Sequence, residues 1–495
     1  MISFVLTILL GSIVLYVLHF YNKVRKLPKG PFPLPLIGNA YQFDPKNLHK
    51  WILEQKETYG PVFTVYIANP VVVLADVKTI REALVTHGEH FAARTLKFPD
   101  NFMHDLPNVG VISSTGHMWQ AQRRLTLQIM RDFGMGRPLM EEKVILSRNE
   151  LIEHLDSLQD KDHVDFSEII HLTIGNIINS VCFGFTYPHN DAKDFYHFSH
   201  LVDSMMTIVC TWQFRFLSIF PDLADYSFIR DYVFSGLYKG NKALRKINIA
   251  RVQKARESYK PNDEPLNFVH AAIKEINAKD SNFSFLNDDH ITAMCFDMYL
   301  AGQETSTTTT KWMILLLMKY PEMQKKMFNE IFDVVGLENE IKLSHKVNLP
   351  YTMAFINEAQ RWANIIPFII GHKCTRDTTI EGKFIPNGSL VQPFFYGSNL
   401  DETVFEDPYQ FKPERFLLED GKTLNKKLYD QMYSFGRGAR VCAGQSLALM
   451  ELQLIVPTLV QRYQFSHPHG EVDLSSEFAG ILAPHHFTCK IVRRT

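Results

Sequence analysis

A single cysteine sits within the glycine-rich stretch Phe435-Gly436-Arg437-Gly438-Ala439-Arg440-Val441-Cys442-Ala443-Gly444. Glycine permits backbone turns that other residues resist, and it lets the chain approach a flat ligand closely. A pattern typical of a helix follows at once, from Gln445 to Arg462. Cys442 therefore stands just before a helix N-terminus, where the helix dipole and free N–H groups favour a thiolate. A thiolate in such a turn can ligate a haem iron from one face.

A lone cysteine in a protein is most often a small buried hydrophobe. Five fixed positions accompany this one (Phe, Gly, Arg, Cys and Gly), and a chance match to them in a chain of 495 residues is on the order of 10⁻⁴. The stretch resembles the haem loop of the cytochromes P-450. The resemblance implies that Cys442 is the axial thiolate ligand of haem b (iron protoporphyrin IX) and that Phe435 packs against that face and shields the sulfur.

The resemblance covers nearly the whole chain, from a proline-rich segment near residue 28 to the C-terminus, and it implies a fold. We expect a mainly α protein with small β-sheets, the cytochrome P-450 fold. This is a triangular α-rich prism with haem between a long central helix and the cysteine loop, preceded by an N-terminal membrane anchor. The stretch Arg131-Asp132-Phe133-Gly134-Met135-Gly136 looks most like animal microsomal (family-2-like) members.

The composition limits the classes of function and compartment. The formal net charge is −1 and 21% of residues are charged, so nothing favours a nucleic-acid partner. The cysteines are scattered without a CxxC pair, which indicates neither a zinc site nor a disulfide framework. A reducing, cytosol-facing compartment is the simpler interpretation. The cysteines are Cys182, Cys210, Cys295, Cys374, Cys442 and Cys489.

The N-terminus differs in kind from the rest of the chain. Met1 to Phe20 carries no charged side chain, and about 20 apolar residues can cross a bilayer as a helix. Basic residues follow between 23 and 29, and positive charge on this flank places it in the cytosol. We therefore predict a transmembrane signal anchor over residues 1–22, a basic and proline-rich hinge over 23–36 and a catalytic domain over 37–495. The microsomal resemblance places the anchor in the endoplasmic reticulum membrane.

A cleaved signal peptide is the alternative interpretation of this segment. Such a peptide needs a basic start, a shorter apolar core and small residues at the cut. Here the start is neutral, and Tyr16, Leu18 and Phe20 fill the region of the cut. The pattern therefore favours an uncleaved anchor.

Strand and helix patterns alternate in an order that suits this fold. Residues rich in β-branched side chains predict strands over Val62–Ala68 and Val71–Leu74. The pattern is then mostly helical to about residue 365. Further strands are predicted within Thr378–Gln392 and near Phe487–Val492.

The longest helical pattern starts near Asp288 and ends before Pro321, roughly three times an average helix. Its middle reads Ala301-Gly302-Gln303-Glu304-Thr305, and Ala301 and Thr305 share one helix face. Small residues on that face leave room for a flat ring and a diatomic ligand. A core helix with a tolerated glycine is the alternative. The stretch resembles the family's oxygen-activation motif, which implies that Glu304 and Thr305 deliver protons during oxygen activation and that Ala301 borders the haem.

A Glu-x-x-Arg pair, Glu358 and Arg361, lies on a predicted helix after Pro350. By itself it is an ordinary surface ion pair of two residues three apart. With Arg415 in Pro413-Glu414-Arg415-Phe416, it resembles the family's buried Glu–Arg–Arg network. The role implied for Glu358, Arg361 and Arg415 is structural.

The resemblance also implies partners for the haem propionates. Trp119 and Arg123 are four apart on a helical pattern, and a guanidinium can bind a carboxylate through two hydrogen bonds. The further matching positions are Arg94, His372 and Arg440. At His372 the neighbours Gly371 and Lys373 depart from the family's usual Pro-His-Ala.

Family positions also indicate an apolar substrate pocket over the opposite haem face. Each of these residues has plain core packing as its alternative. The pocket residues are Phe98, Phe102, Phe214, Phe296, Ala301, Ile366, Phe368, Ile481 and Leu482. The apolar segments Phe216–Pro221 and Tyr232–Phe234 are candidates to dip into a bilayer and admit lipophilic substrates.

The activity implied is that of a haem-thiolate monooxygenase that uses O2 and NADPH-derived electrons on a lipophilic small molecule. Because the chain shows no nucleotide-binding pattern, the electrons must come from a separate protein. The family implies NADPH–cytochrome P-450 reductase, with cytochrome b5 as a second donor. Arg124, Arg131, Lys426 and Lys427 are candidates for a basic docking surface.

Two other functions remain open at this stage. A haem-thiolate isomerase or dehydratase rearranges peroxides without a reductase and would not need Glu304 and Thr305. A membrane-tethered haem sensor would have no turnover. The substrate and the oxidised position are not fixed by the sequence, since they depend on pocket shape.

Overall fold

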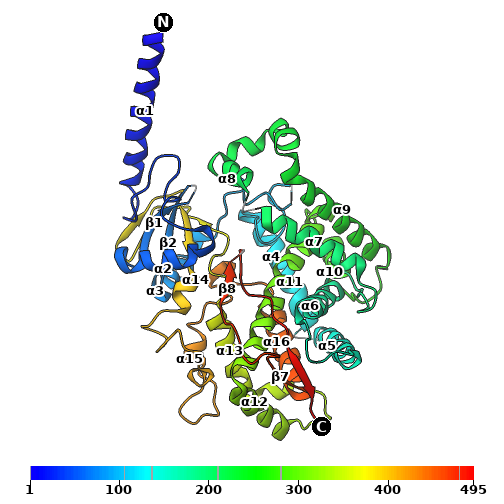
Figure 1. The fold of residues 1–495 in the computed structure, drawn as a ribbon. Helices are drawn as coiled ribbons and strands as arrows, with labels where there is room; N and C mark the ends of the chain where they lie inside the picture. Colours follow the sequence, from blue (N-terminus) through cyan, green and yellow to red (C-terminus); the bar gives the residue numbers. More distant parts are fainter. Residues whose placement is uncertain are drawn as a thin grey trace.

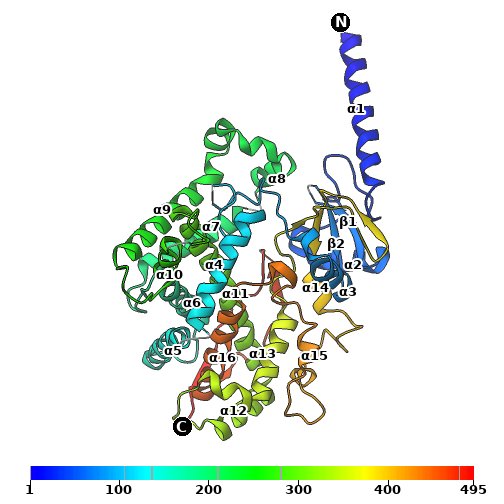
Figure 2. The same cartoon turned by 180° about the vertical axis from the view of Figure 1, so that it is seen from behind.

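The protein is a helix-rich body with its main sheet at one end, from which the first helix projects (Figures 1 and 2). This computed structural model describes residues 2–67, 69–104, 106–134, 138–208, 211–278, 281–478 and 480–495. Four residues that bear on the predictions lie outside the described ranges. They are Ala68, Met135, Gly136 and Cys210.

Helix α11 (Asp288–Lys319) runs through the middle of the body (Figure 1). The side chain of Asn287 caps it by accepting hydrogen bonds from two N–H groups of the first turn. Pro321 starts the next helix, α12 (Pro321–Val334), and ends α11 just before it. The predicted long helix is confirmed at 32 residues.

The helices with the most extensive contacts to α11 come from four distant parts of the chain. They are α6 (Phe166–Cys182), α9 (Ser235–Glu257), α13 (Pro350–Ala363) and α16 (Gln445–Arg462). Helix α6 approaches especially closely, because a Cβ at Gly302 would lie 2.9 Å from Ile178 Cδ1. This contact explains why a poor helix former stands in the middle of α11.

The remaining helices surround this centre. They are α2 (Leu48–Tyr59), α3 (Val77–Arg81), α4 (Gly116–Gly134), α5 (Leu139–Ser157), α7 (Lys193–Thr207), α8 (Trp212–Ile219), α10 (Phe268–Asn277), α14 (Phe395–Asn399) and α15 (Lys426–Tyr429). The largest buried cluster lies among the helices and includes Trp312, Phe166 and Phe268. Two smaller clusters lie beside the main sheet, around Phe91 and around Phe63.

The main sheet has the strand order β1-β2-β6-β3. Strand β1 (Val62–Tyr66) pairs antiparallel with β2 (Pro70–Leu74), and Val62 lies opposite Leu74. Strand β6 (Leu390–Pro393) runs parallel to β2 and antiparallel to β3 (His372–Lys373). The predicted strands after residues 62, 71 and 378 are thus confirmed, and the second begins one residue earlier than expected.

Three two-stranded sheets complete the fold. Strand β4 (Thr378–Ile380) pairs with β5 (Lys383–Ile385), and β8 (Ser476–Phe478) pairs with β9 (Leu482–Pro484). Near the C-terminus, β7 (Tyr463–Ser466) pairs with β10 (Lys490–Arg493). Strand β10 begins at Lys490, later than the predicted strand near Phe487.

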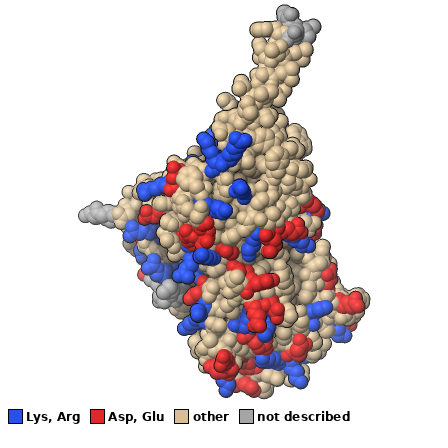
Figure 3. Space-filling model, turned by 90° about the vertical axis from the view of Figure 1, so that its left-hand side faces the viewer, with Lys and Arg blue, Asp and Glu red and all other residues tan. Residues whose placement is uncertain are grey.

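Helix α1 (Ile2–Val24) projects from the sheet end of the body (Figures 1 and 2). Its span Phe4–Val24 is long and apolar enough to cross a membrane, and none of that span is buried. In Figure 3 its described part carries no charged side chains until its base, whereas both signs of charge are scattered over the body. The helix fits the predicted membrane anchor in length and composition.

Candidate active site

The cysteine loop packs tightly against the backbone of Leu84, and its two ends are joined by a hydrogen bond. Gly438 has φ 75°, a backbone conformation that favours glycine, and a Cβ there would collide with the carbonyl oxygen of Leu84. The Cys442 N–H donates to the carbonyl oxygen of Phe435 at 2.9 Å, which joins the two ends of the loop. Helix α16 then starts at Gln445, as the sequence predicts.

The thiol of Cys442 faces a space inside the protein. Its side chain is exposed, yet the surrounding protein is dense enough that burial raises the pKa of the Cys442 thiol. The N–H groups of Gly444 and Gln445 and the charge of Arg123 act in the opposite direction. Burial therefore outweighs the helix end that the sequence suggested would favour a thiolate. A bound metal ion reverses this balance, because a coordinating thiol is deprotonated outright.

Helix α11 borders an opening of the same kind. Ala301 is exposed although Tyr299, Gln303 and Ser306 beside it on the helix are buried. The Thr305 hydroxyl donates to the Ala301 carbonyl oxygen at 2.7 Å, so both residues lie on this open face. Because α11 packs against the helix that follows Cys442, we infer that Cys442 and the Ala301–Thr305 face border one space, which we call the central hollow.

The two sides of the central hollow belong to helices that pack together. Helix α16, which follows Cys442, contacts α11, and the Ser306 hydroxyl donates to Glu451 Oε2 at 2.5 Å. Burial raises the pKa of Glu451 to about 8. This contact fixes the cysteine side of the hollow relative to the α11 side.

Three arginines, Arg94, Arg123 and Arg440, gather beside Trp119 and form what we call the arginine cluster. The guanidinium carbon of Arg440 lies 3.8 Å from the centroid of the Trp119 ring, and that of Arg123 lies 5.9 Å from it. Burial and the charges of Arg94 and Arg123 lower the pKa of Arg440 to about 8. Burial likewise lowers the pKa of Arg94 to about 10.

The arginine cluster donates to backbone carbonyl oxygens, and no ion pair in the described part of the chain joins it to a carboxylate. Arg123 Nη2 donates to Val441 O at 2.6 Å, and Arg440 Nη2 donates to Ser114 O at 2.7 Å. The nearby Asp100 accepts instead from the hydroxyl of Thr95 at 2.7 Å. The cluster thus holds an excess of positive charge in a poorly solvated place.

Two more hydrogen-bonding atoms belong to this region. Nε1 of Trp119 and Nε2 of His372 are buried without a hydrogen-bond partner. His372 lies near Arg94 and Arg440, and burial together with these charges lowers the pKa of His372 to about 3. The structure therefore brings His372 to the other predicted propionate partners despite its unusual neighbours. This set of donors lacks an anion with several acceptor oxygens, which the carboxylates of a haem would provide.

Comparisons with known proteins point the same way. The sequence model of the family described as Cytochrome P450 matches residues 28–488. Cytochrome P450 2E1 of Oryctolagus cuniculus is 31% identical over 473 residues, which cover 94% of this chain and 94% of the relative. Cytochrome P450 2K4 of Oncorhynchus mykiss is 33% identical over 480 residues, with 94% and 92% covered.

This chain belongs to the cytochrome P450 family. A solved structure of a zebra fish cytochrome P450 with progesterone shares its fold, with a TM-score of 0.77. That match covers 90% of this chain and 99% of the other at 24% identity. As a cytochrome P450, the protein is a haem-thiolate monooxygenase, and the donor set described above fits such a haem.

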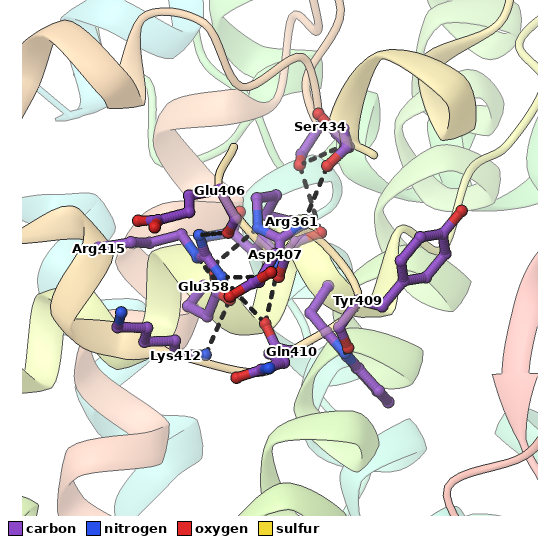
Figure 4. Close-up of polar contacts among 12 residues, drawn as sticks. Glu358, Arg361, Glu406, Asp407, Tyr409, Gln410, Lys412, Arg415 and Ser434 are labelled. Carbon is purple, nitrogen blue, oxygen red and sulfur yellow. Dashed lines mark hydrogen bonds and ion pairs between the residues drawn. The ribbon is translucent and has the colours of Figure 1, made fainter. Parts of the chain in front are cut away.

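The residues of the predicted Glu–Arg–Arg network of this cytochrome P450 contact one another (Figure 4), and the side chains of Glu358 and Arg361 are fully buried. The Glu358 carboxylate accepts from Arg361 Nε and Nη2, both at 2.8 Å, and from Arg415 Nε at 3.0 Å. The Lys412 N–H also donates to Glu358 at 2.9 Å, and Arg361 Nη1 donates to Asn399 O. The network ties α13 to the segment that leads into the cysteine loop.

The predicted pocket residues of this cytochrome P450 fall into two groups. Phe98, Phe102 and Phe214 form one aromatic cluster with ring centroids 4.7–5.6 Å apart. Phe296 is buried on α11 with its ring edge-on to His104 at 5.7 Å. Phe98, Phe102 and Phe296 belong to the largest buried cluster, and Phe214 packs against it.

The second pocket group comes from the segments after α13 and before β9. Phe368 stacks on Phe394 at 5.2 Å and so lies in the core beside the main sheet. Leu482 is buried, and its N–H donates to the carbonyl oxygen of Ile365 at 2.8 Å, which joins the two segments. Ile366 and Ile481 are partly exposed next to this junction.

Sequence reasoning missed several polar contacts of α11. Asp297 accepts from the N–H groups of Val111 and Ile112 at 2.6 and 2.9 Å, and His104 Nε2 lies 2.8 Å from its other oxygen. Glu451 was missed as well. The Glu451 contact and the Asp297 contacts join residues more than 140 positions apart, so no local pattern announces them.

Proposed function

We propose that this cytochrome P450 inserts one atom of O2 into a lipophilic small molecule, a xenobiotic, a fatty acid or another lipid. NADPH supplies the electrons through a separate NADPH–cytochrome P-450 reductase, and cytochrome b5 is a second donor. The observation that supports the proposal is the pair of exposed groups that would border the central hollow, the Cys442 side chain and the Ala301–Thr305 face of α11.

Cys442 would hold the haem iron, and Phe435 would pack beside the sulfur. The arginine cluster, with Trp119 and His372, would bind the propionates, since all five carry N–H donors and none has an acidic partner among the residues that the structure describes. When bound, a thiolate-ligated haem supplies the chemistry of O2 activation. Glu358, Arg361 and Arg415 support the loop from behind and touch no reacting atom.

Thr305 and Glu304 would deliver protons at the edge of the central hollow. The Thr305 hydroxyl is held by the Ala301 carbonyl oxygen and keeps its own lone pairs open to the hollow. Burial and the charge of Asp203 raise the pKa of Glu304 to about 7. A carboxyl group with that pKa can give up and regain a proton at neutral pH, which suits a general acid.

The substrate would be apolar because the surroundings of Ala301 are. The Phe98–Phe102–Phe214 cluster and Phe296 offer aromatic contacts and few hydrogen-bond donors. An exposed apolar surface around α8 leads toward this cluster. It includes Trp212, Phe216, Phe220, Tyr232 and Val233.

Residues 1–22 would anchor the protein in the endoplasmic reticulum membrane, with 23–36 as the hinge and 37–495 as the catalytic domain on the cytosolic side. The apolar, unburied α1 followed by basic residues supports this arrangement. A reductase would dock on exposed basic side chains of the body. The candidates Arg124, Arg131, Lys426 and Lys427 are all exposed.

Two alternative functions have less support than the monooxygenase. A haem-thiolate isomerase or dehydratase would need no proton-delivering pair, so Thr305 and the near-neutral pKa of Glu304 favour the monooxygenase. A haem sensor without turnover would need no apolar surface leading to the hollow. Consumption of NADPH with reductase and an added lipophile would exclude the sensor.

The first experiment is a reduced-plus-CO difference spectrum of the protein and of Cys442→Ala. We expect a long-wavelength Soret band in the wild type alone. Reconstitution with reductase and a panel of lipophiles should then give oxygenated product, and Thr305→Ala should lower the product formed per NADPH. Absence of the band from the wild type, or equal coupling in Thr305→Ala, would overturn the proposal.

A further inference from the structure

Glu304 makes a second contact that leads away from the central hollow. Its Oε1 lies 3.4 Å from Nε2 of His171, which comes from α6. The backbone around this contact is fixed, because Gln303 Nε2 donates to the His171 carbonyl oxygen at 2.6 Å. The close approach of Ile178 to Gly302 holds the same two helices together. The two side chains therefore face each other across a rigid helix pair.

His171 in turn contacts α7. Its Nε2 lies 2.9 Å from the Ser199 hydroxyl oxygen, and the ring of Phe195 lies edge-on at 5.5 Å. The next residues on α7 reach the outer surface, since the side chains of His200 and Asp203 are 80% and 50% exposed. A hydroxyl and an imidazole can each accept and donate a proton. These groups thus lead from Glu304 to α7, a helix whose outer side is exposed.

The electrostatics make the Glu304–His171 contact one between a neutral imidazole and a titrating carboxyl group rather than an ion pair. Burial, with the charges of Lys311 and His200, lowers the pKa of His171 to about 4. At pH 7 the imidazole is therefore neutral, while Glu304, with a pKa of about 7, is present in both forms. A neutral imidazole can donate to the carboxylate or accept from the acid, so it serves both forms.

We propose that His171 is the positioning residue of Glu304 and the outer member of a proton path that runs from the α7 surface through Glu304 to Thr305. The proposal rests on the proposed function, because only a monooxygenase must bring protons to the central hollow. His171 touches neither substrate nor haem and acts through Glu304. In each passage Nε2 of the imidazole takes a proton from the Ser199 hydroxyl and releases it to the Glu304 carboxylate, and the hydroxyl regains a proton from the α7 side, so both groups return to neutral.

Several other charged or titratable groups face this pair, and each biases the proton balance. From α11 come Lys311, which lowers the pKa of Glu304, and the buried Tyr299. Asp203 on α7 acts on Glu304, and His200 acts on His171. More distant groups act on Lys311 or on Tyr299, and these are Asp165, Tyr187 and Arg251.

Two variants separate positioning from proton passage. In His171→Gln the amide can still donate to the Glu304 carboxylate, but it does not pass protons. In His171→Phe both capacities are lost. His197→Gln, an exposed histidine on the same helix as Ser199, is the matched control. The reduced-plus-CO band of each holoenzyme reports that the fold and haem site are intact.

The readout that does not depend on turnover is an infrared titration of the protonated Glu304 carbonyl stretch, identified by its loss in Glu304→Gln. We expect a midpoint near 7 in the wild type, the same midpoint in His171→Gln and a higher one in His171→Phe, since the carboxylate there loses its donor. An unchanged midpoint in His171→Phe would overturn the positioning role.

The turnover readout is product formed per NADPH, with its solvent isotope effect and pH profile. We expect both variants to lose coupling by about tenfold, the lower end for partners that orient a functional group, while His197→Gln keeps it. Wild-type coupling in His171→Gln would overturn the proton path. Failure of the wild type itself to form product would instead overturn the proposed function. The infrared titration would still test whether His171 positions Glu304.

Discussion

The guanidinium of Arg440 stacks on the Trp119 ring at 3.8 Å while its nitrogen atoms donate to three backbone carbonyl oxygens. Burial and two other guanidiniums lower the pKa of Arg440, so the group is held where positive charge is unfavourable. A bound anion would offset the unfavourable burial of these positive charges. This relationship leads to the first prediction.

Arg440→Leu should abolish stable haem binding, and Arg440→Lys should weaken it strongly. A lysine keeps the charge but loses both the planar stacking on Trp119 and the paired donors. The measurement is the haem-to-protein ratio after purification, together with the reduced-plus-CO band. Arg245→Leu, at an exposed ion pair with Asp289, is the control and should keep its haem. Full haem content in Arg440→Leu would contradict the assignment.

Gly438→Ala should disrupt the cysteine loop, because the new methyl group would meet the Leu84 carbonyl oxygen. Gly382 has a similar φ of 71° but nothing within 4 Å of an added Cβ. Gly382→Ala therefore carries only the backbone strain, about 1 kcal/mol. We expect haem binding to be lost in Gly438→Ala and kept in Gly382→Ala, as judged by absorbance. Equal behaviour of the two variants would show that the close approach to Leu84 is unimportant.

Glu358→Gln should lower the free energy of unfolding strongly. Removing one partner from a buried charge network leaves an uncompensated charge and costs about 3–5 kcal/mol. Here two arginines, Arg361 and Arg415, would lose their carboxylate. The exposed pair Arg256–Asp288 offers a comparison, and Arg256→Gln should change stability by no more than about 1 kcal/mol. Chemical denaturation of the holoenzymes measures both.

Glu451 should make stability fall as pH rises. Its pKa in the folded state is about 8, above its ordinary value of 4.5, so its contribution to stability is fully present below pH 4.5 and is lost as pH rises through 8. The slope in this window is at most about 1.4 kcal/mol per pH unit. Glu451→Gln should remove it, because a neutral amide replaces the acid beside Ser306. Denaturation midpoints at pH 6, 7 and about 8 would test this, and parallel curves for the two proteins would contradict it.

The sequence predicts the elements of this protein better than it predicts their electrostatics. Helix α16 was expected to run from Gln445 to Arg462 and does so, because a glycine-rich turn and an apolar pattern mark its start locally. The resemblance implied a Glu358–Arg361–Arg415 network, and in the structure the Glu358 carboxylate contacts both arginines. Features of this kind depend on residues that are close together in the sequence, so a local pattern can predict them.

What the sequence did not reveal depends on residues far apart in the chain. The Cys442 thiol has a raised pKa because of the protein packed around it, although the helix N-terminus alone suggested the opposite. The contact of His171 with Glu304 spans two helices, and neither residue carries a local signature of it. Such effects arise from the packing of α6, α11 and α16, which no window along the chain contains.

The attachment of α1 to the body has a consequence for orientation. Phe20 lies 5.7 Å from Tyr66 of the main sheet, Tyr21 stacks on Phe32 at 5.5 Å, and the Tyr21 hydroxyl donates to Pro33 O. Helix α8 lies toward the same end of the molecule as α1 (Figures 1 and 2). If α1 lies in a bilayer, these aromatic contacts attach the body to it rigidly and limit rotation between the two. They would set the tilt of the whole body, and with it the direction from which a lipid-dissolved molecule meets α8.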